Sequence, residues 1–437
     1  MASSKTPVDR FIQGTNAADL QTMLDAFAQG AEVFDDGKSF KGDALRMFCE
    51  RGIIDHNGRM KLVEKVDRDD GRIFRHVMME GDFASEFGIH DAFDLFLLGT
   101  VKNDKIEYLE MGDVDPRKPT MRTVYAASGN PTDPLSSIRV HKRNLPKPRE
   151  GWVRVKMEAV GLNFHDIFTL RGMGIHEIRY PMILGNEGAG VLDNGTEVAI
   201  YPNLGDPDFK GDETVDPKRH GTLAEYVVVP KRNAVPRPQG LDAKDAAVMG
   251  IAWLTAYRMM FRKANLRPGQ TALVQGSSGG VTTALIQLGS AAGFRIWSTG
   301  RTENKRELAR RLGAESTFEP LAQLPYLVDA VFDTSGAATI SHSLACVKPG
   351  GIVVSCGIHS EGGSTEMKID LLHLFADQIS LTGVYTGTRE EFVDLLNFVT
   401  AKGIKPHIGK VLPLEKADEG LKDIWTGQTK GKVIITI

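Results

Sequence analysis

The stretch TALVQGSSGGVTTALIQLGSAAG, residues Thr271–Gly293, is the part of the chain from which the fold can be worked out. It predicts a short apolar strand over 271–275, a turn of small residues, and a helix over 281–292. This order presents free backbone N–H groups to a diphosphate. Gly276 and Gly279 fit the spacing G-x-x-G-x-x-G, but Thr282 stands where the last glycine would allow close helix–strand packing. The stretch therefore indicates a dinucleotide-binding turn that departs from the usual pattern at one place.

The next predicted strand, over 295–299, ends in groups that favour NADPH over NADH. An NAD-binding unit normally places Asp or Glu there, to accept a hydrogen bond from the ribose 2′-OH. No acid stands at Thr299, Gly300 or Arg301, and Lys305 follows at the start of the next helix. A hydroxyl, a guanidinium and an ammonium suit a 2′-phosphate. Solvated charges are the plainer interpretation, but cations are unfavourable near a helix start, so a bound anion explains them better.

Composition limits the class of protein. A chain of 437 residues exceeds one ordinary core, which predicts two or three domains. A net charge of −3 argues against a nucleic-acid binder that works by bulk charge. Cys49, Cys346 and Cys356 form no disulfide framework and no metal-ligand pattern in the sequence, which favours a reducing compartment. The sequence has no apolar signal core and no run of the ~18 apolar residues that span a bilayer, so we expect a cytoplasmic protein without membrane partners.

Residues 8–111 form a unit of their own. Apolar residues at helical spacing predict helices over 8–15 and 17–29, the second capped by Asn16, and a further helix is expected over 43–51. Four strand-like runs follow, at 59–67, 72–81, 90–98 and 105–111. Helices followed by a curved antiparallel sheet predict an α+β cone.

Two runs in this unit carry a resemblance to a known family. They are FIQGTNAADLQTMLDAFAQGAEVFDDGKSFKG (11–42) and GDFASEFGIHDAFDLFLLGTVKNDKIEYLEMG (81–112), and they resemble the SnoaL-like cyclases of the nuclear-transport-factor-2-like cone fold. The resemblance implies either an enzyme or a non-catalytic pocket or dimerisation module. An enzyme would need a carboxylate or His inside the cone to move a proton beside a carbonyl. The candidates are Asp35, His56, His76 and Asp82, although Asp35 also suits a plain turn and a lone His is more often structural.

The rest of the chain resembles a second family. Strand-rich segments between 121 and 229 precede the nucleotide-binding unit, which predicts a substrate domain covering the cofactor from one side. The motifs AVGLNFHDIFTLRG (159–172), YPMILGNEGAGVL (180–192), GTLAEYVVVP (221–230), WLTAY (253–257), VKPGGIVVSCG (347–357) and TKGKVIITI (429–437) accompany the glycine turn. Together they resemble the zinc-free quinone-reductase and enoyl-reductase branch of the medium-chain dehydrogenase/reductase superfamily.

This resemblance implies a GroES-like, β-rich catalytic domain that is split around an α/β Rossmann domain with a doubly wound parallel sheet. The expected domains are a SnoaL-like cone at 1–115, the first catalytic part at 116–246, the NADP-binding Rossmann domain at 247–385 and the second catalytic part at 386–437. The sequence itself predicts six strands in the Rossmann domain, at 271–275, 295–299, 315–318, 328–333, 351–356 and 379–384.

Residue chemistry predicts that no metal is bound. Zinc-dependent relatives place a Cys near the position of Asn163 and a His near that of Asn186, and a neutral amide is a poor zinc ligand beside thiolate or imidazole. The loop 206–220, where relatives can carry a four-cysteine zinc lobe, contains no Cys. The carbonyl oxygen of the substrate must then be polarised by hydrogen bonds.

The resemblance implies two groups of site residues. Asn163 is the expected oxyanion donor, with His165, Arg171 and Tyr180 as lesser candidates, while Asp166 and Glu187 are expected to brace loops. The expected cofactor contacts are Thr255, Gly276, Ser277, Ser278, Gly279, Gly280, Val281, Thr282, Thr299, Arg301, Lys305 and Gly357.

The sequence therefore predicts an NADPH-dependent, metal-independent reductase of a conjugated carbonyl compound (an enone or enoyl group) or a quinone. The N-terminal pocket domain would bind, isomerise or cyclise the same small-molecule intermediate. The alternative is an NADPH-sensing or scaffold protein whose cone is a dimerisation or partner-binding module, and a zinc-type alcohol dehydrogenase is a third interpretation. A homodimer is expected, because the apolar strand at 379–384 could pair between subunits.

Overall fold

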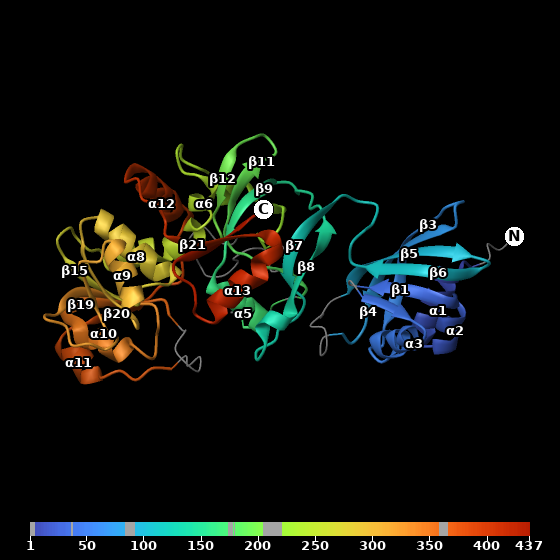
Figure 1. Ribbon diagram of the computed structural model, residues 1–437, viewed down its shortest axis with the longest axis horizontal. Coiled ribbons are helices and arrows are strands. Elements are labelled where there is room, and N and C mark those ends of the chain that lie inside the picture. Colours follow the sequence, from blue (N-terminus) through green and yellow to red (C-terminus); the bar gives the residue numbers. More distant parts are fainter. Residues whose placement is uncertain are drawn as a thin grey trace.

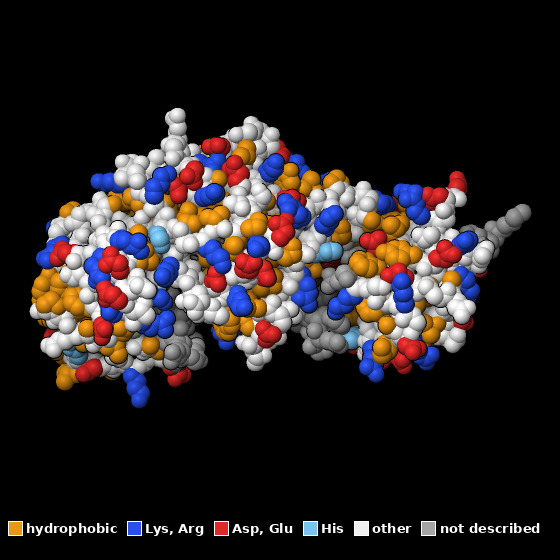
Figure 2. Space-filling model, viewed as in Figure 1, with side chains coloured by type: hydrophobic (Ala, Val, Ile, Leu, Met, Phe, Trp, Pro, Cys, Tyr) orange, Lys and Arg blue, Asp and Glu red, His pale blue; other side chains and the backbone are white. Residues whose placement is uncertain are grey.

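The computed structural model describes residues 5–35, 38–83, 92–173, 178, 180–203, 221–357 and 366–437. These residues form an N-terminal domain, a β-rich domain and an α/β domain (Figure 1). The β-rich domain lies between the other two, which occupy opposite ends of the molecule. No helix in the described residues is both long and apolar enough to cross a membrane. On the face shown in Figure 2, acidic and basic side chains are interspersed over all three parts.

The N-terminal domain is a six-stranded sheet with short helices. Its strand order is β2-β1-β6-β5-β4-β3, in which β1 runs parallel to β6 and the other neighbours are antiparallel. Its helices are α1 (Pro7–Ala17), α2 (Leu20–Asp25) and α3 (Asp43–Met47), with a π-helical segment over Phe48–Ile54. Its strands are β1 (Phe27–Asp35), β2 (Lys38–Lys41), β3 (Arg59–Asp67), β4 (Arg72–Glu80), β5 (Phe93–Lys102) and β6 (Lys105–Gly112).

The helix predicted over 17–29 is wrong in its second half. α2 ends at Asp25, and Phe27 begins β1 because it pairs with Ile106 of β6. The predicted cap is also wrong, since Asn16 exchanges hydrogen bonds of 2.7 and 2.9 Å with the backbone of Met60. The cap of α2 is Asp19 instead, whose carboxylate accepts from the backbone N–H of Thr22 at 3.1 Å.

The β-rich domain contains two sheets, with strand orders β10-β7-β8 and β14-β12-β11-β9-β22-β21, and β13 pairs separately with β9. The strands before the α/β domain are β7 (Thr120–Ala126), β8 (Ile138–Asn144), β9 (Trp152–Gly161), β10 (Met182–Ile183), β11 (Ala189–Leu192), β12 (Glu197–Ile200), β13 (Tyr226–Pro230) and β14 (Ala234–Pro236). Helix α5 (Phe164–Arg171) follows β9. After the α/β domain the chain returns with β21 (Ile408–Pro413), α13 (Ala417–Trp425) and β22 (Lys432–Thr436), and β22 pairs antiparallel with β9.

The α/β domain has a parallel sheet of order β17-β16-β15-β18-β19-β20. Its strands are β15 (Thr271–Gln275), β16 (Arg295–Thr299), β17 (Ser316–Phe318), β18 (Val328–Asp333), β19 (Val347–Ser355) and β20 (Ser380–Gly383). Its helices are α7 (Leu254–Tyr257), α8 (Gly280–Ala291), α9 (Glu303–Arg311), α10 (Ile340–Cys346), α11 (Leu371–Ala376) and α12 (Arg389–Ala401). The strand order reverses beside β15, so the prediction of a doubly wound Rossmann sheet is confirmed, and ligands bind such sheets at this switch point.

Candidate active site

The glycine turn leaves β15 at the switch point of the sheet. Gly276 has a φ of 104°, a conformation that side-chain-bearing residues rarely adopt. Helix α8 then begins at Gly280 without a side-chain cap on its first N–H groups. Thr282, at the position of the missing glycine, is buried, and its hydroxyl donates to the carbonyl of Gly279 at 3.0 Å. The departure from the glycine pattern thus adds a hydrogen bond that braces the turn.

The hydroxyl of Thr299 supports the same turn. Its hydroxyl accepts from the backbone N–H of Gly276 at 2.9 Å and lies 3.1 Å from the side-chain oxygen of Gln275. The Thr299 hydroxyl is therefore occupied within the protein, and its contact with a 2′-phosphate stays a prediction. Ser277 differs, because its buried hydroxyl has no hydrogen-bond partner among the described residues. It points to where a β-carbon on Gly300 would lie, only 2.6 Å away.

A group of cations lies beside the turn. Arg301 is exposed, and Lys305 is half-buried at the start of α9. Burial, then the charges of Arg301 and Lys430, lower the pKa of Lys305. The nearby acid Glu303 is already shared by Arg306 and Arg310. Three like charges thus gather without an ion pair to an acidic side chain among the described residues, and an anion would relieve their repulsion.

Lys430 was not among the predicted residues. It belongs to the C-terminal segment before β22, and no local pattern relates it to the turn after β16. Only the return of the chain to the β-rich domain brings it near Lys305. The motif TKGK at 429–432 is the one local sequence signal for it, and that motif indicates the family rather than a phosphate contact.

Two further expected cofactor residues hold the framework together. Thr255, buried in α7, donates its hydroxyl to the carbonyl of Tyr385 at 3.0 Å. A β-carbon on Gly357 would lie 2.2 Å from the carbonyl carbon of Thr334, so only glycine lets the ends of β18 and β19 approach this closely. Both residues fix the edge of the sheet at which the turn lies.

A buried ionic cluster joins the β-rich domain to the C-terminal strand. The Lys432 ammonium donates to Oε1 of Glu187 at 2.7 Å, to Oδ1 of Asn163 at 2.6 Å and to the carbonyl of Leu162 at 2.6 Å. The other oxygen of Glu187 accepts from the backbone N–H of Ile251 at 2.8 Å. The side chains of Lys432 and Glu187 are 3% and 0% exposed, so both charges depend on this pairing.

The cluster occupies the side chain of Asn163. Its amide nitrogen donates to Glu187 at 2.8 Å and to the carbonyl of Gly161 at 3.2 Å, while its oxygen accepts from Lys432. The side chain expected to act as an oxyanion donor is therefore fully hydrogen-bonded within the protein, and a contact with the substrate stays a prediction. Lys432, which the sequence did not predict as a site residue, donates hydrogen bonds to both Asn163 and Glu187. A lysine at the start of the apolar strand KVIITI was its only local signal.

His165 and Asn186 offer unpaired atoms instead. His165 is the second residue of α5, and burial lowers the pKa of its imidazole, a shift that the side chain of Asn186 partly opposes. The two side chains thus lie close to each other, and in the described residues His165 Nδ1 and Asn186 Oδ1 are buried without a hydrogen bond of normal length. Unpaired buried polar atoms are costly, so both are suited to a bound molecule.

Asp166 fixes the beginning of α5. Its carboxylate accepts from the backbone N–H groups of Asn163 and Gly185, at 2.9 and 2.8 Å. Complete burial nevertheless raises its pKa to about 6, more than these hydrogen bonds lower it. Asp166 thus ties the loop before α5 to the loop that carries Asn186 and Glu187.

Tyr180 and Arg171 do not join this group. The Tyr180 hydroxyl donates to the carbonyl of Thr169 at 2.5 Å, and burial raises its pKa to about 12. Its ring packs in the core of the β-rich domain, so the predicted proton donor acts as a structural residue. Arg171, at the end of α5, lies over the ring of Trp425 at 5.6 Å. Most of the loop 172–180 and all of 206–220 lie outside the described residues.

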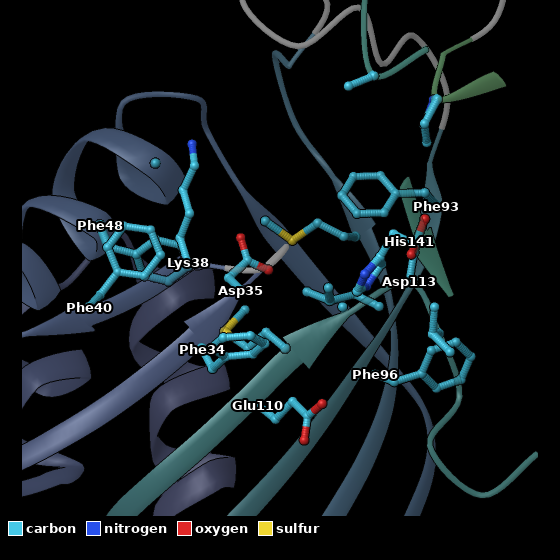
Figure 3. A pocket seen from close by; sticks show the side chains of 18 of the residues that line it. Phe34, Asp35, Lys38, Phe40, Phe48, Phe93, Phe96, Glu110, Asp113 and His141 are labelled. Atoms are coloured by element: carbon cyan, nitrogen blue, oxygen red, sulfur yellow. The ribbon is translucent and has the colours of Figure 1, made fainter. Parts of the chain in front are cut away.

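The four candidates in the N-terminal domain are not brought together. His56 stacks on Phe83, with ring centroids 5.4 Å apart, and its Nδ1 lies 2.8 Å from the carbonyl of Arg51. His76 bonds with Asp94 at 2.7 Å on the sheet. Asp82 accepts from the amide of Asn57 at 2.6 Å. Of the four, Asp35 lines the cavity shown in Figure 3.

The donor set around Glu187 does not fit zinc. Asn163 and Asn186 are neutral amides, the Glu187 carboxylate is paired with Lys432 at 2.7 Å, and the Asp166 carboxylate is occupied by the backbone N–H groups of Asn163 and Gly185. A second cation there would be repelled by the ammonium. Within the described ranges no three His, Cys, Asp or Glu side chains gather in a way that could hold a metal ion.

The doubly wound sheet and its glycine turn form an arrangement typical of dinucleotide-binding oxidoreductases. Two family profiles match the chain: the alcohol dehydrogenase GroES-like domain over residues 149–239 and the zinc-binding dehydrogenase over residues 280–401. Quinone oxidoreductase of Rattus norvegicus is 30% identical over 317 residues, covering 67% of this chain and 91% of that protein. The chain belongs to the medium-chain dehydrogenase/reductase family.

Other relatives within the family carry different names. A zinc-type alcohol dehydrogenase-like protein of Schizosaccharomyces pombe is 27% identical over 320 residues, covering 67% of this chain and 92% of its own. A solved NAD-dependent alcohol dehydrogenase is 29% identical with a TM-score of 0.66, covering 72% of this chain and 99% of that chain. A 2-octenoyl-CoA carboxylase reductase in complex with NADP has a TM-score of 0.66 over 74% of this chain and 88% of its own, at 20% identity, which shows the shared fold alone.

Proposed function

We propose that the protein is an NADPH-dependent, metal-independent reductase of a conjugated carbonyl compound or a quinone. The observation that carries the proposal is the buried cluster of Lys432, Glu187 and Asn163. The Lys432 ammonium, paired with the Glu187 carboxylate, disfavours a metal ion there and leaves hydrogen bonding as the means of polarising a carbonyl. Relatives named quinone oxidoreductase, in rat, mouse and human, are consistent with this chemistry.

The residues beside the glycine turn support NADPH as the cofactor. When bound, NADPH supplies the hydride. The uncapped N–H groups at the start of α8 would hold the diphosphate. Arg301, Lys305 and Lys430 would hold the 2′-phosphate, which relieves the repulsion that already lowers the pKa of Lys305. The unpartnered Ser277 hydroxyl beside Gly300 offers a further polar contact to the same end of the cofactor.

His165 and Asn186 are proposed to face the substrate. Hydride addition to an enone or quinone builds negative charge on the oxygen, and a positioned donor stabilises that charge. Burial favours the neutral form of the His165 imidazole, which can still donate one N–H. Asn163, Asp166 and Lys432 act as positioning residues, because they fix the loop from which α5 starts.

The test is an assay of NADPH oxidation by the full-length protein against cyclohexenone, benzoquinone and a medium-chain enoyl thioester. The protein is first dialysed against a chelator, with metal content measured before and after. The proposal predicts turnover of at least one acceptor that survives metal removal. NADPH binding without any turnover would favour the sensing or scaffold alternative, and turnover that requires zinc would contradict the metal-independent mechanism.

We also propose a homodimer formed through the α/β domain. β20 is an edge strand of the parallel sheet, and such strands present unpaired backbone groups. The neighbouring helix α11 exposes Leu371, Leu372 and Phe375 by 71%, 73% and 79%, and hydrophobic side chains are visible at this end of the molecule in Figure 2. Light scattering should give a dimer for the natural chain and a monomer for Phe375→Glu; a monomeric natural chain would contradict the proposal.

A further inference from the structure

A large cavity lies at the other boundary of the β-rich domain, where it meets the N-terminal domain. Its volume is about 730 Å³, within the ~300–1,000 Å³ range of sites for small molecules. Both domains line it (Figure 3), and the α/β domain with its glycine turn occupies the opposite end of the molecule (Figure 1). The cavity is therefore separate from the site of hydride transfer.

The wall from the N-terminal domain is aromatic. Phe40 and Phe48 lie against each other with ring centroids 4.6 Å apart, and Phe34 lies below them in the view of Figure 3. Phe93 and Phe96 line the other side of the opening. Aromatic faces favour flat apolar partners through stacking and edge contacts. This wall suits a planar apolar body.

The wall from the β-rich domain is basic. Arg139, His141 and Arg143 alternate along β8, so their side chains share one face of the strand, and all three line the cavity. Arg143 pairs with Asp113 and lies over the ring of Tyr125 at 4.3 Å.

Arg139 and His141 keep unused hydrogen-bonding groups. Arg139 donates one nitrogen, Nη1, to the carbonyls of Ser136 and Ile138. Its other guanidinium nitrogens and the exposed His141 ring form no side-chain hydrogen bond with the described residues.

Protein carboxylates enter the cavity from the N-terminal domain. Asp35 of β1 and Glu110 of β6 line the cavity together with the aromatic rings. In Figure 3 the Glu110 carboxylate points away from His141, and Asp35 lies across the opening from it. A third carboxylate of the lining, Asp113, lies beside His141 in Figure 3 and is paired with Arg143. Arg139 and His141 are therefore the basic groups that remain to face a bound molecule, whose apolar end would lie against the aromatic rings.

The segment that joins the domains holds the two walls in place. Arg117 forms a two-pronged ion pair with Glu64 of β3, with both N···O distances 2.9 Å, and its side chain also binds Asp115. The backbone of Asp115 exchanges hydrogen bonds of 2.6 and 2.9 Å with the amide of Asn144 at the end of β8. We call Glu64, Asp115, Arg117 and Asn144 the linker clamp. It ties the outer strand of the N-terminal sheet to the strand that carries Arg139 and His141.

We propose that this cavity is a second binding site, built by two domains, for a planar apolar molecule that carries a carboxylate or a similar anionic oxygen group. The rings of Phe34, Phe40, Phe48, Phe93 and Phe96 hold its body, and Arg139 with His141 binds its anion. The inference does not depend on the reductase activity, because none of these residues belongs to the dinucleotide turn or to the cluster around Lys432.

Calorimetric titration of the full-length protein tests the proposal with two probes of the same shape, 2-naphthoate and its neutral amide, 2-naphthamide. The expected result is saturable binding of one 2-naphthoate per chain, tighter than that of the amide. Arg139→Ala with His141→Ala should weaken 2-naphthoate about 10- to 100-fold and the amide less than about threefold, as for lost charge-assisted hydrogen bonds. Phe40→Ala should weaken both probes by about tenfold, because it removes apolar contact from either ligand.

Lys142→Ala is the matched control, since Lys142 lies on the opposite face of β8 and does not line the cavity. It should leave both affinities unchanged. Failure of both probes to bind, equal affinity for the acid and the amide, or unchanged binding in the double variant would each overturn the proposal. These titrations use no NADPH, so their outcome is independent of the reductase assay.

Discussion

The β-rich domain meets a neighbouring domain at each of two boundaries. Its polar side chains are buried and paired at one boundary and exposed at the other. At the boundary with the α/β domain, Lys432, Glu187 and Asn163 are buried and bonded to one another. At the boundary with the N-terminal domain, Arg139 and His141 stay exposed beside an aromatic cavity of about 730 Å³. The first arrangement fixes geometry and leaves little capacity for a ligand. The second leaves both space and donors.

The difference follows from the cost of burying charge. A buried ion pair is tolerated only when nearly every lone pair and proton finds a partner, and removal of one member leaves an uncompensated charge. An exposed cation carries no such cost and gains from a partner only when one arrives. We therefore expect substitutions at the first boundary to act on stability, and those at the second to act on binding.

The largest effect is expected from Lys432→Met. The change leaves Glu187 buried without its cation, which should lower the free energy of unfolding by about 3–5 kcal/mol. Urea denaturation followed by tryptophan fluorescence measures the loss. The double variant Lys432→Met with Glu187→Gln should recover much of it, because no unpaired charge remains. A loss below about 1 kcal/mol in the single variant would contradict the view that this boundary depends on the ion pair.

The next effect concerns close packing at the end of the parallel sheet. Gly357→Ala places a β-carbon 2.2 Å from the backbone of Thr334, so the strand ends must separate. We expect a loss of roughly 1–3 kcal/mol in thermal or urea unfolding. Gly383→Ala is the control, since a β-carbon there meets nothing within 4 Å. An equal loss of stability in the two variants would show that the close approach of the two strand ends is not needed for stability.

A smaller effect is expected at the linker clamp. Arg117→Ala removes the ion pair with Glu64 and one partner of the buried Asp115. Because the guanidinium is partly exposed, the expected loss is about 1 kcal/mol. The variant should also weaken 2-naphthoate binding, because the ion pair that links the two walls of the cavity is lost. Tighter binding, or none of the expected destabilisation, would show that the clamp does not hold the cavity.

The clamp should also depend on pH. Arg117, above all, holds the pKa of Asp115 at about 2, below its ordinary value of 3.8. The folded state therefore binds fewer protons than the unfolded state between these values. The stabilisation by ionised Asp115 is present above pH ~4 and is lost as pH falls toward 2. Acid titration of unfolding should show a shallower decline in this range for Asp115→Asn; parallel curves would contradict the assignment.

The sequence predicted the α/β domain better than the N-terminal domain, and the reason is the range of the contacts. The strands expected at 271–275 and 295–299 are those observed, because apolar runs between turns are a local signal. The prediction of a helix over 17–29 is wrong beyond Asp25, because Phe27 pairs with Ile106 in a parallel ladder that local spacing does not reveal.

The same distinction holds for the candidate site. Gly276 and the cations after β16 could be predicted because they adjoin one strand and one turn. The hydrogen bonds that occupy the Asn163 side chain could not be predicted, because its partner Lys432 lies on the last strand of the chain. The placement of Asp35 in a cavity shared by two domains likewise depends on how the domains meet.

The most direct test of the central claim is the ratio of kcat/KM for NADPH to that for NADH, measured with one acceptor in the natural chain and in Arg301→Ala with Lys305→Ala. We predict a preference for NADPH of at least about tenfold in the natural chain, and a loss of about 10- to 100-fold with NADPH but less than about threefold with NADH in the variant. A natural chain that uses NADH equally well, or a variant that loses both cofactors to the same extent, would contradict the account.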